Sequence, residues 1–317
     1  MLNIMKTKFR LFIAAIAMLA ISFSSCKKDK DSSTANSDYT SEFSSQSDDQ
    51  ASVSDAVDEV ADDANNVLGD HPSLTGRLTN LTCNATAVVD SISDPRTVTL
   101  TYNGQNCAGN HTRVGVVVLS MPAGTHWRDV GAVLTIDVQN LKITRLRDGK
   151  SLTINGTKTI TNVTGGLVEN LGNSTMSIIH NIATTGSGFT ITFDNGSQRV
   201  WNVSKKRVFS YNNGIVITTT GTHSEGSLTD ISEWGTNRFG NNFVTEIISP
   251  MIVRQDCNFR LVSGEVKHDR LRADVVVTFG LDAQGLPTSC PALGETYYFK
   301  LVWTGNNGIV RTVILPY

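Results

Sequence analysis

Cysteine is the residue whose chemistry this sequence indicates most directly. Cys26 stands alone near the N-terminus, directly after two serines that close a mainly apolar run over residues 11–23. A thiol at that place is a candidate for covalent modification rather than for pairing. The remaining cysteines are an even set in the body of the chain: Cys83, Cys107, Cys257 and Cys290.

The segment before Cys26 has the three parts of a secretory signal, with Lys6, Lys8 and Arg10 ahead of the apolar run and small residues behind it. The run is shorter than the roughly 20 residues that span a bilayer. A cysteine after "FSS" resembles a bacterial lipoprotein signal, in which a peptidase cleaves before the cysteine and the cysteine is acylated. We therefore predict a signal peptide over 1–25 and a lipid anchor at Cys26. An uncleaved anchor with an incidental cysteine is the alternative.

Residues 26–72 differ sharply in composition from the rest of the chain, because they carry twelve acidic residues against three lysines. So few apolar side chains cannot offset the entropy of ordering, which predicts a flexible acidic tether. Within it, apolar residues recur at helical spacing and predict a short helix over 52–68, with aspartates on its other face. A solvated acidic stalk explains the same residues. The apolar positions are Val53, Val57, Val60, Ala64, Val67 and Leu68.

The tether begins "CKKDKD", and charged runs after an acylated cysteine resemble the surface-export signals of Bacteroidota lipoproteins. Lys27 stands where lipoproteins retained in the inner membrane carry aspartate. These features predict an outer-membrane location with a lipid anchor. Whether the protein faces the cell surface or the periplasm stays open at this point.

Residues 73–317 read as an antiparallel all-β body, sandwich-like in arrangement. Short alternating runs rich in Val, Ile, Thr and aromatic residues favour strands. Asn-Gly and Asp-Gly pairs between them, in "YNGQN", "RDGK", "FDNGS", "YNNG" and "GNNG", suit tight hairpins. The runs are "RTVTLTY", "AVLTIDVQNLKI", "SLTINGTKTITNV", "GFTITF", "GIVITTTG", "ADVVVTF", "YYFKLVW" and "GIVRTVIL".

Two parts of the body echo each other and predict a duplicated module, over about 83–119 and 257–303. Both open with Cys-Asn, carry a valine five residues later, run into an alternating strand and close on a second cysteine. In the strands, Val98, Leu100 and Tyr102 correspond to Val275, Val277 and Phe279.

The four body cysteines allow three disulfide connectivities in an oxidising compartment. If each module is an out-and-back hairpin, its two cysteines meet at the open end, which favours Cys83–Cys107 and Cys257–Cys290. Each bond would then stabilise the fold by about 3 to 4 kcal/mol through loop closure. A zinc site is the competing interpretation, but no two of these cysteines have the close spacing of structural zinc ligands.

Several segments together resemble a family of uncharacterised Bacteroidota lipoproteins. The resemblance covers most of the chain after Cys26 and rests on strand patterns more than on sharp motifs. It implies a β body with disulfides, and it brings no activity and no binding residues. The segments are "DDQASVSDAVDEVADDANN", "DPRTVTLTYNGQNC", "LTINGTKTITNVTGG", "QRVWNVSKKRVF" and "VRQDCNFRLVSGEV".

Motifs for enzyme chemistry are absent from the sequence: there is no Gly-x-Ser-x-Gly, His-Glu-x-x-His, phosphate-binding glycine loop or EF-hand loop. The histidines are isolated, although a sheet could gather His180, His223 and His268 around a metal. Lone histidines are more often surface residues, so we predict no catalytic residue, no metal and no cofactor. The segment 222–242 lacks strand patterning, and as a long loop it is a candidate ligand site.

Aromatic residues give a second functional hypothesis, because exposed flat rings can stack on sugars. Trp127, Trp201 and Trp234 lie near turns or in polar strands, and His223 shares the segment of Trp234. We name these four as candidate ligand-binding residues, against ordinary packing as the alternative. The basic cluster in "VSKKRVF" is too small for a nucleic-acid surface.

The sequence therefore favours a lipid-anchored cell-envelope protein with a non-enzymatic structural or interaction role. Its expected partners are the membrane, through the anchor, and envelope proteins or glycans, but no nucleic acid. A glycan-binding surface module is the first alternative, and a hydrolase with an unrecognised site is the second.

Overall fold

The computed structural model describes residues 83–172, 177–269, 274–290, 296–304, 308 and 310–317. Before residue 83 it describes Leu74 and a set of helical positions. The predicted signal peptide 1–25, the predicted lipidation site Cys26 and the tether as far as residue 48 lie outside the described residues. The helical positions are Asp49, Ser52, Val53, Ala56, Val57, Glu59, Val60, Ala61, Asp63, Ala64, Asn66, Val67 and Leu68.

The body is built from strands, and the described part contains sixteen of them in one sheet. Two short 3₁₀ turns, η3 (Val168–Asn170) and η4 (Gln255–Cys257), lie between strands. The strands are β1 (Ala85–Asp90), β2 (Arg96–Gln105), β3 (His111–Met121), β4 (Ala132–Arg145), β5 (Ser151–Asn162), β6 (Ile178–Thr184), β7 (Phe189–Phe193), β8 (Gln198–Tyr211), β9 (Ile215–Gly221), β10 (His223–Glu225), β11 (Leu228–Thr236), β12 (Asn242–Arg254), β13 (Arg260–Asp269), β14 (Asp274–Leu281), β15 (Tyr298–Thr304) and β16 (Val310–Pro316).

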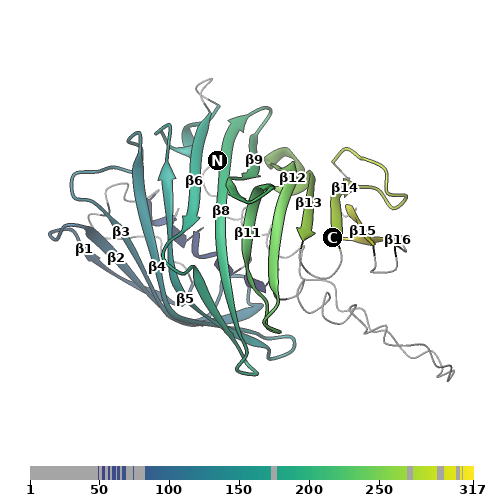
Figure 1. Cartoon of the computed structure of the whole chain (residues 1–317). Coiled ribbons are helices and arrows are strands. Elements are labelled where there is room, and N and C mark those ends of the chain that lie inside the picture. The colour runs from purple at the N-terminus through teal and green to yellow at the C-terminus, as the bar shows by residue number, and fades with distance from the viewer. Residues whose placement is uncertain are drawn as a thin grey trace.

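All neighbouring strands pair antiparallel. The order along the sheet is β1-β2-β3-β4-β5-β6-β8-β11-β12-β13-β14-β15-β16. The short strands fill positions beside this path: β7 pairs with β5 and β8, β9 with β8 and β12, and β10 with β11. The predicted antiparallel all-β body is confirmed, and its sandwich-like arrangement takes the form of one continuous, strongly curved sheet (Figure 1).

Alternation places one face of the sheet in the core. In β4, Ala132, Leu134, Ile136 and Val138 are at most 3% exposed, while the residues between them are partly exposed. Side chains in a strand point alternately to the two faces, so a period of two buries one face only. The main core cluster contains buried apolar residues from β2 to β8, Phe243 of β12 and apolar residues of the N-terminal helical segment.

The turn predictions hold for three of the five Asn-Gly and Asp-Gly pairs. Gly149, Gly196 and Gly214 adopt positive φ at the β4–β5, β7–β8 and β8–β9 connections. The pair in "GNNG" lies largely outside the described residues. The pair in "YNGQN" was predicted wrongly, because β2 continues through Gly104, where a Cβ would lie 2.8 Å from Asn84 Cγ. Gly104 therefore makes room for the side chain of Asn84 and does not mark a turn.

Both predicted disulfides are present, Cys83–Cys107 and Cys257–Cys290, with Cα–Cα distances of 5.1 and 5.4 Å. Each follows the same local plan, since the residue after the first cysteine, Asn84 or Asn258, has a left-handed backbone. The next two strands pair with each other, and the strand after the second cysteine extends the meander. The three strands are β1–β2–β3 in one case and β13–β14–β15 in the other.

Among the described residues, no helix combines the length and the apolar character that crossing a bilayer requires.

Candidate functional site

The N-terminal helical segment docks on the concave face of the sheet (Figure 1). The described positions within 52–68 are helical, as the apolar spacing predicts, and the segment is docked rather than a solvated stalk. Burying a valine or leucine stabilises by about 1.5–3 kcal/mol. That exceeds the roughly 0.7 kcal/mol by which a residue such as Asp or Val disfavours a helix. The buried apolar helix residues are Val53, Ala56, Val57, Val60, Ala61, Ala64, Val67 and Leu68.

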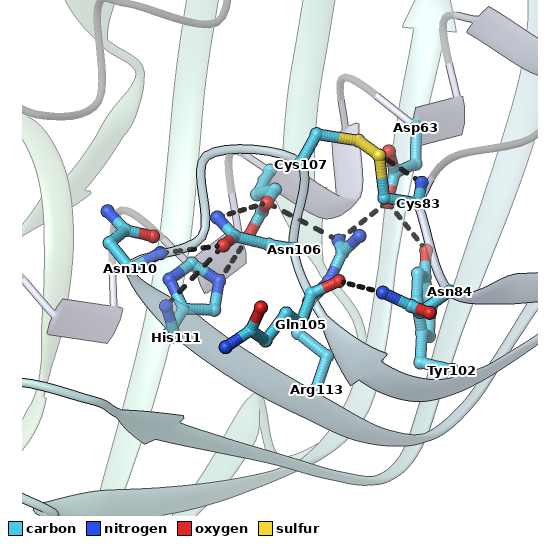
Figure 2. A network of polar contacts seen from close by, with 11 residues as sticks. Asp63, Cys83, Asn84, Tyr102, Gln105, Asn106, Cys107, Asn110, His111 and Arg113 are labelled. Carbon is cyan, nitrogen blue, oxygen red and sulfur yellow. Dashed lines mark hydrogen bonds and ion pairs between the residues drawn. A yellow bond between two sulfur atoms is a disulfide. The ribbon is translucent and has the colours of Figure 1, made fainter.

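A polar network joins this helix to the β2–β3 hairpin. Figure 2 shows Asp63 facing Tyr102 and Arg113, and Asp63 Oδ2 accepts hydrogen bonds from Tyr102 Oη at 2.8 Å and Arg113 Nη1 at 2.7 Å. One turn earlier, Glu59 Oε2 lies 2.7 Å from His111 Nε2, and Asn106 Nδ2 donates to Glu59 Oε1 at 3.2 Å. Two helix carboxylates therefore meet one guanidinium, one imidazole and one phenol inside the fold.

The network is buried, and its pKa values reflect both burial and neighbouring charge. Burial raises the pKa of Glu59, but the His111 hydrogen bond and the Arg113 charge outweigh it, so the net shift is downward. Burial lowers the pKa of Arg113, but the charges of Asp63 and Glu59 raise it by more, so the net shift is upward. Burial and the nearby Asp63 charge raise the pKa of Tyr102 well above its usual value. At neutral pH the carboxylate of Glu59 and the guanidinium of Arg113 are charged and the phenol is protonated.

The disulfide and two asparagines hold the hairpin end of this network. Asn84 Nδ2 donates to the Gln105 carbonyl at 2.7 Å, and the Cys83 N–H points at Cys107 Sγ at 3.1 Å (Figure 2). Asn106 Oδ1 accepts the backbone N–H of Asn110 at 3.1 Å, which closes the loop between β2 and β3. The helix therefore docks against a loop that covalent and polar contacts have already fixed.

What this network can do is hold the helix. Each of its acids is engaged by a base or a phenol, and a guanidinium that is 2% exposed lies between the two carboxylates. Removing one partner of such a buried pair costs about 3–5 kcal/mol, because the other charge stays buried. The docked position of the N-terminal segment therefore depends on these charge pairs.

A second polar cluster lies further along the concave face, on β8 and β11. Glu233 is 5% exposed and accepts hydrogen bonds from Lys205 Nζ at 2.5 Å and Trp201 Nε1 at 3.2 Å. Next to it, Nδ1 of His268 on β13 lies 3.0 Å from Oγ1 of Thr245 on β12. Burial lowers the pKa of His268 to about 4, so this ring is neutral at pH 7.

Two of the four predicted ligand-binding residues are core residues. Trp127 is 4% exposed and packs edge-on against His180 with ring centroids 5.1 Å apart. Trp201 is 1% exposed and belongs to the main core cluster. A buried ring cannot stack on a sugar in solution, so in this structure ordinary packing explains both tryptophans.

The other two predicted residues come together. His223 on β10 and Trp234 on β11 stack with ring centroids 4.0 Å apart and an interplanar angle of 11°, and both are partly exposed. We predicted that the segment 222–242 is a long loop. This prediction is wrong, because β10 and β11 occupy most of the segment. Its polar residues occupy exposed and buried positions alike, among them the buried Ser232 and Glu233, and this hid the strand pattern.

The three histidines proposed as a metal set do not form one. His180 lies between Trp127 and Phe209, His223 on Trp234, and His268 beside Thr245. In the described part of the chain the only cluster with metal-ligand spacing is Asp256 with Cys257 and Cys290. Those two sulfurs are joined in a disulfide, which removes their thiolate character.

A small hollow lies between the helix and the sheet. Its volume is about 30 Å³, room for about one water molecule. It has an apolar floor and a basic side formed by Lys158, Lys205 and Arg207. Lys158 Nζ donates to the Val57 carbonyl at 3.2 Å, so this lysine also secures the helix.

Sequence reasoning missed Asp63 and Arg113. The aspartates were placed on the solvent face of the helix, yet Asp63 is 6% exposed and faces the sheet. The available signal was in β3, where Arg113 occupies the same alternating face as Val117 and Leu119. An arginine at a core position of a strand indicates a buried acidic partner, and the acidic helix was the richest source of one.

Comparisons with protein-family models, with curated proteins and with solved structures find no match for this chain.

Proposed function

We propose that this chain is a lipid-anchored protein of the bacterial outer membrane with a non-enzymatic structural or interaction role. The docked N-terminal helix is the observation that carries the proposal. The described positions of the segment between Cys26 and the body are bound to the body from Asp49 onward. Asp49 pairs with Arg238, and the apolar helix residues pack in the main core. Only residues 27–48 then separate the lipid from the body, a reach of at most about 75 Å.

Two further features support this proposal. The paired cysteines suit an oxidising compartment outside the cytoplasm. The polar network of Glu59, Asp63 and Arg113 serves docking, since its members contact one another across the helix–sheet boundary. A body that can lie no further than this reach from its anchor suits a protein that contacts other envelope components.

The anchor is tested by metabolic labelling with an alkyne analogue of palmitate, followed by membrane fractionation. The wild-type protein and the matched control Ser25→Ala are expected to carry the label and to sediment with the outer membrane. Cys26→Ala is expected to lose both properties. Equal labelling of Cys26→Ala would overturn the anchor, and protease treatment of intact cells then shows which membrane face the body occupies.

The non-enzymatic role has its own test. The purified full-length protein in detergent is incubated with generic ester, peptide and glycoside substrates, and separately with envelope extract after cross-linking. The proposal expects inertness toward the substrates and a defined cross-linked partner. Turnover that is lost on substitution of one partly exposed side chain, such as His223→Ala, would instead support a hydrolase.

Glycan binding is a second candidate function because of the His223–Trp234 stack. Two rings stacked face to face at a partly exposed position offer an apolar platform of the kind that aromatic faces provide. Titration of oligosaccharides should then shift tryptophan fluorescence, and Trp234→Ala should abolish the shift. Trp303→Ala is the matched control. No response across a broad glycan panel would remove this candidate.

A further inference from the structure

Two turns of the sheet flank the start of the N-terminal helix. The β4–β5 turn contacts it through Arg145, whose Nη1 donates to Ser52 Oγ at 3.3 Å. The β11–β12 turn contacts it through Arg238, which binds both carboxylate oxygens of Asp49. Helical positions 49 and 52 are less than one turn apart, a rise of about 4.5 Å. We call this pair of turns the entry end, which comprises residues 145–150 and 237–241.

Each turn of the entry end presents an exposed apolar side chain on a fixed backbone. Leu146 is 47% exposed and Phe239 is 52% exposed. The Leu146 N–H donates to the Asn110 carbonyl at 3.0 Å, and the Phe239 N–H donates at 3.0 Å to Oδ1 of Asn237, which is fully buried. Single exposed apolar residues are common on protein surfaces, so the position of these two beside the incoming chain is what gives them weight.

The entry end is also basic. The β4–β5 turn reads "RLRDGK", with three cations against one carboxylate. Arg145 pairs with Asp148 at 2.9 Å, while Arg147 keeps 43% of its side chain exposed and Lys150 is exposed. Apolar side chains flanked by basic ones favour the surface of a bilayer that carries anionic headgroups, because burial and charge attraction then act together.

The opposite end of the sheet also exposes apolar side chains, but in a different electrostatic setting. Ile92 in the β1–β2 turn is 95% exposed and lies between Asp90 and Asp94 in the sequence. Val130 is 77% exposed and follows an Arg-Asp pair whose charges cancel. Turning this end toward the bilayer would also use about 43 Å of the reach of residues 27–48, the length of the 13-residue strand β12.

We propose that the entry end is the membrane-facing end of the body. Leu146 and Phe239 enter the headgroup region of the bilayer, and Arg147 and Lys150 contact anionic headgroups. The inference rests on the proposed lipid anchor and adds an orientation to it. The anchor limits only the distance between body and bilayer, whereas these turns determine which end of the sheet meets the lipid.

Fluorescence quenching in vesicles tests this orientation on the acylated protein isolated from membranes. Leu146→Cys, Phe239→Cys and Ile92→Cys, the matched control at the opposite end, each receive an environment-sensitive fluorophore. The proteins are reconstituted in vesicles of phosphatidylethanolamine with phosphatidylglycerol as the minor component. Lipid with brominated acyl chains should quench the labels at positions 146 and 239 at least threefold more strongly than the label at position 92.

A charge reversal tests the role of the basic side chains. Arg147→Glu with Lys150→Glu should weaken quenching of the label at position 239. Arg128→Glu with Lys206→Glu, the same change of charge at exposed positions away from the entry end, should leave it unaltered. If both pairs of substitutions act alike, the contact of Arg147 and Lys150 with headgroups is refuted.

The remaining outcomes separate the orientation from the anchor. Stronger quenching at position 92, or equal quenching at both ends, overturns the inference. A protein that floats with the vesicles while no label is quenched also overturns it, and in that case the lipid anchor stands. A protein that does not float with the vesicles refutes the anchor itself, and the inference with it.

Discussion

The polar contact between Asp63 and Arg113 should dominate the stability of the docked helix. Asp63→Ala removes the acceptor for Arg113 Nη1 at 2.7 Å and for Tyr102 Oη at 2.8 Å, and both donors remain buried. Breaking a buried charge pair costs about 3–5 kcal/mol. Glu59 lies 3.7 Å from Arg113 and still offsets part of the charge. We therefore expect a loss of about 3 kcal/mol, at the lower end of that range.

Native-state hydrogen exchange over residues 49–68 measures this loss directly, because it reports the free energy of opening of the helix separately from global unfolding. Denaturant unfolding with the disulfides intact gives the global value. Asp194→Ala, at an exposed turn, is the matched control and should change either value by at most about 0.5 kcal/mol.

A second substitution distinguishes a lost charge pair from a general loss of packing. In Asp63→Ala with Arg113→Met no buried guanidinium is left without its partner, so the double variant should be more stable than the sum of the single effects predicts. The expected coupling is about 1–2 kcal/mol. If Asp63→Ala matches the Asp194→Ala control, or if the two single effects simply add, the structural reasoning is refuted.

Three further predictions concern other parts of the fold. Burial lowers the pKa of His180 from about 6.5 to about 4, so the neutral ring stabilises the folded state above pH 6.5. That stability, about 3 kcal/mol at most, is lost as pH falls toward 4. His180→Phe should reduce the slope of this part of a stability–pH profile, to which the buried His268 also contributes, and an unchanged slope would contradict the assignment. Gly221→Ala should destabilise by more than about 1 kcal/mol in denaturant unfolding, since a Cβ there would overlap the Asp230 carbonyl; a neutral result would show that β9 and β11 can move apart. Replacing Cys83 and Cys107 together by alanine should lower the free energy of unfolding by about 3 kcal/mol on the chain-entropy model. Helix exchange should also accelerate in that variant, and unaltered exchange would mean that the hairpin end does not support docking.

The alternating runs account for eight of the sixteen described strands, because each of those strands carries its own signal. All eight alternating runs identified in the sequence are strands, among them β2, β4 and β5. Strands with weaker alternation were missed, for example β11, where a register shift between Ile231 and Glu233 interrupts the period of two. A bulge changes which face a side chain meets, and a sequence pattern does not record it.

The tryptophans show where single-residue arguments fail. Trp201 and Trp234 both sit among polar neighbours in the sequence, yet one is 1% exposed and the other is partly exposed. The difference arises because the helix covers the concave face on which Trp201 lies. No local pattern contains that information, since the covering segment is more than a hundred residues away in the chain.

Residue patterns alone indicate the antiparallel β class and the helical spacing of residues 52–68, and they favour the two disulfide pairs among three connectivities. Each of these depends on short-range periodicity or on a hairpin that brings its own ends together. In contrast, the folded arrangement was needed to show that the strands form one curved sheet and that the acidic helix turns Asp49, Glu59 and Asp63 inward. Buried charge is stable only opposite its counter-charge. The counter-charges come from parts of the chain distant in sequence, Arg113 from β3 and Arg238 from the turn between β11 and β12. Their pairing with the helix therefore exists only once the sheet has folded around it.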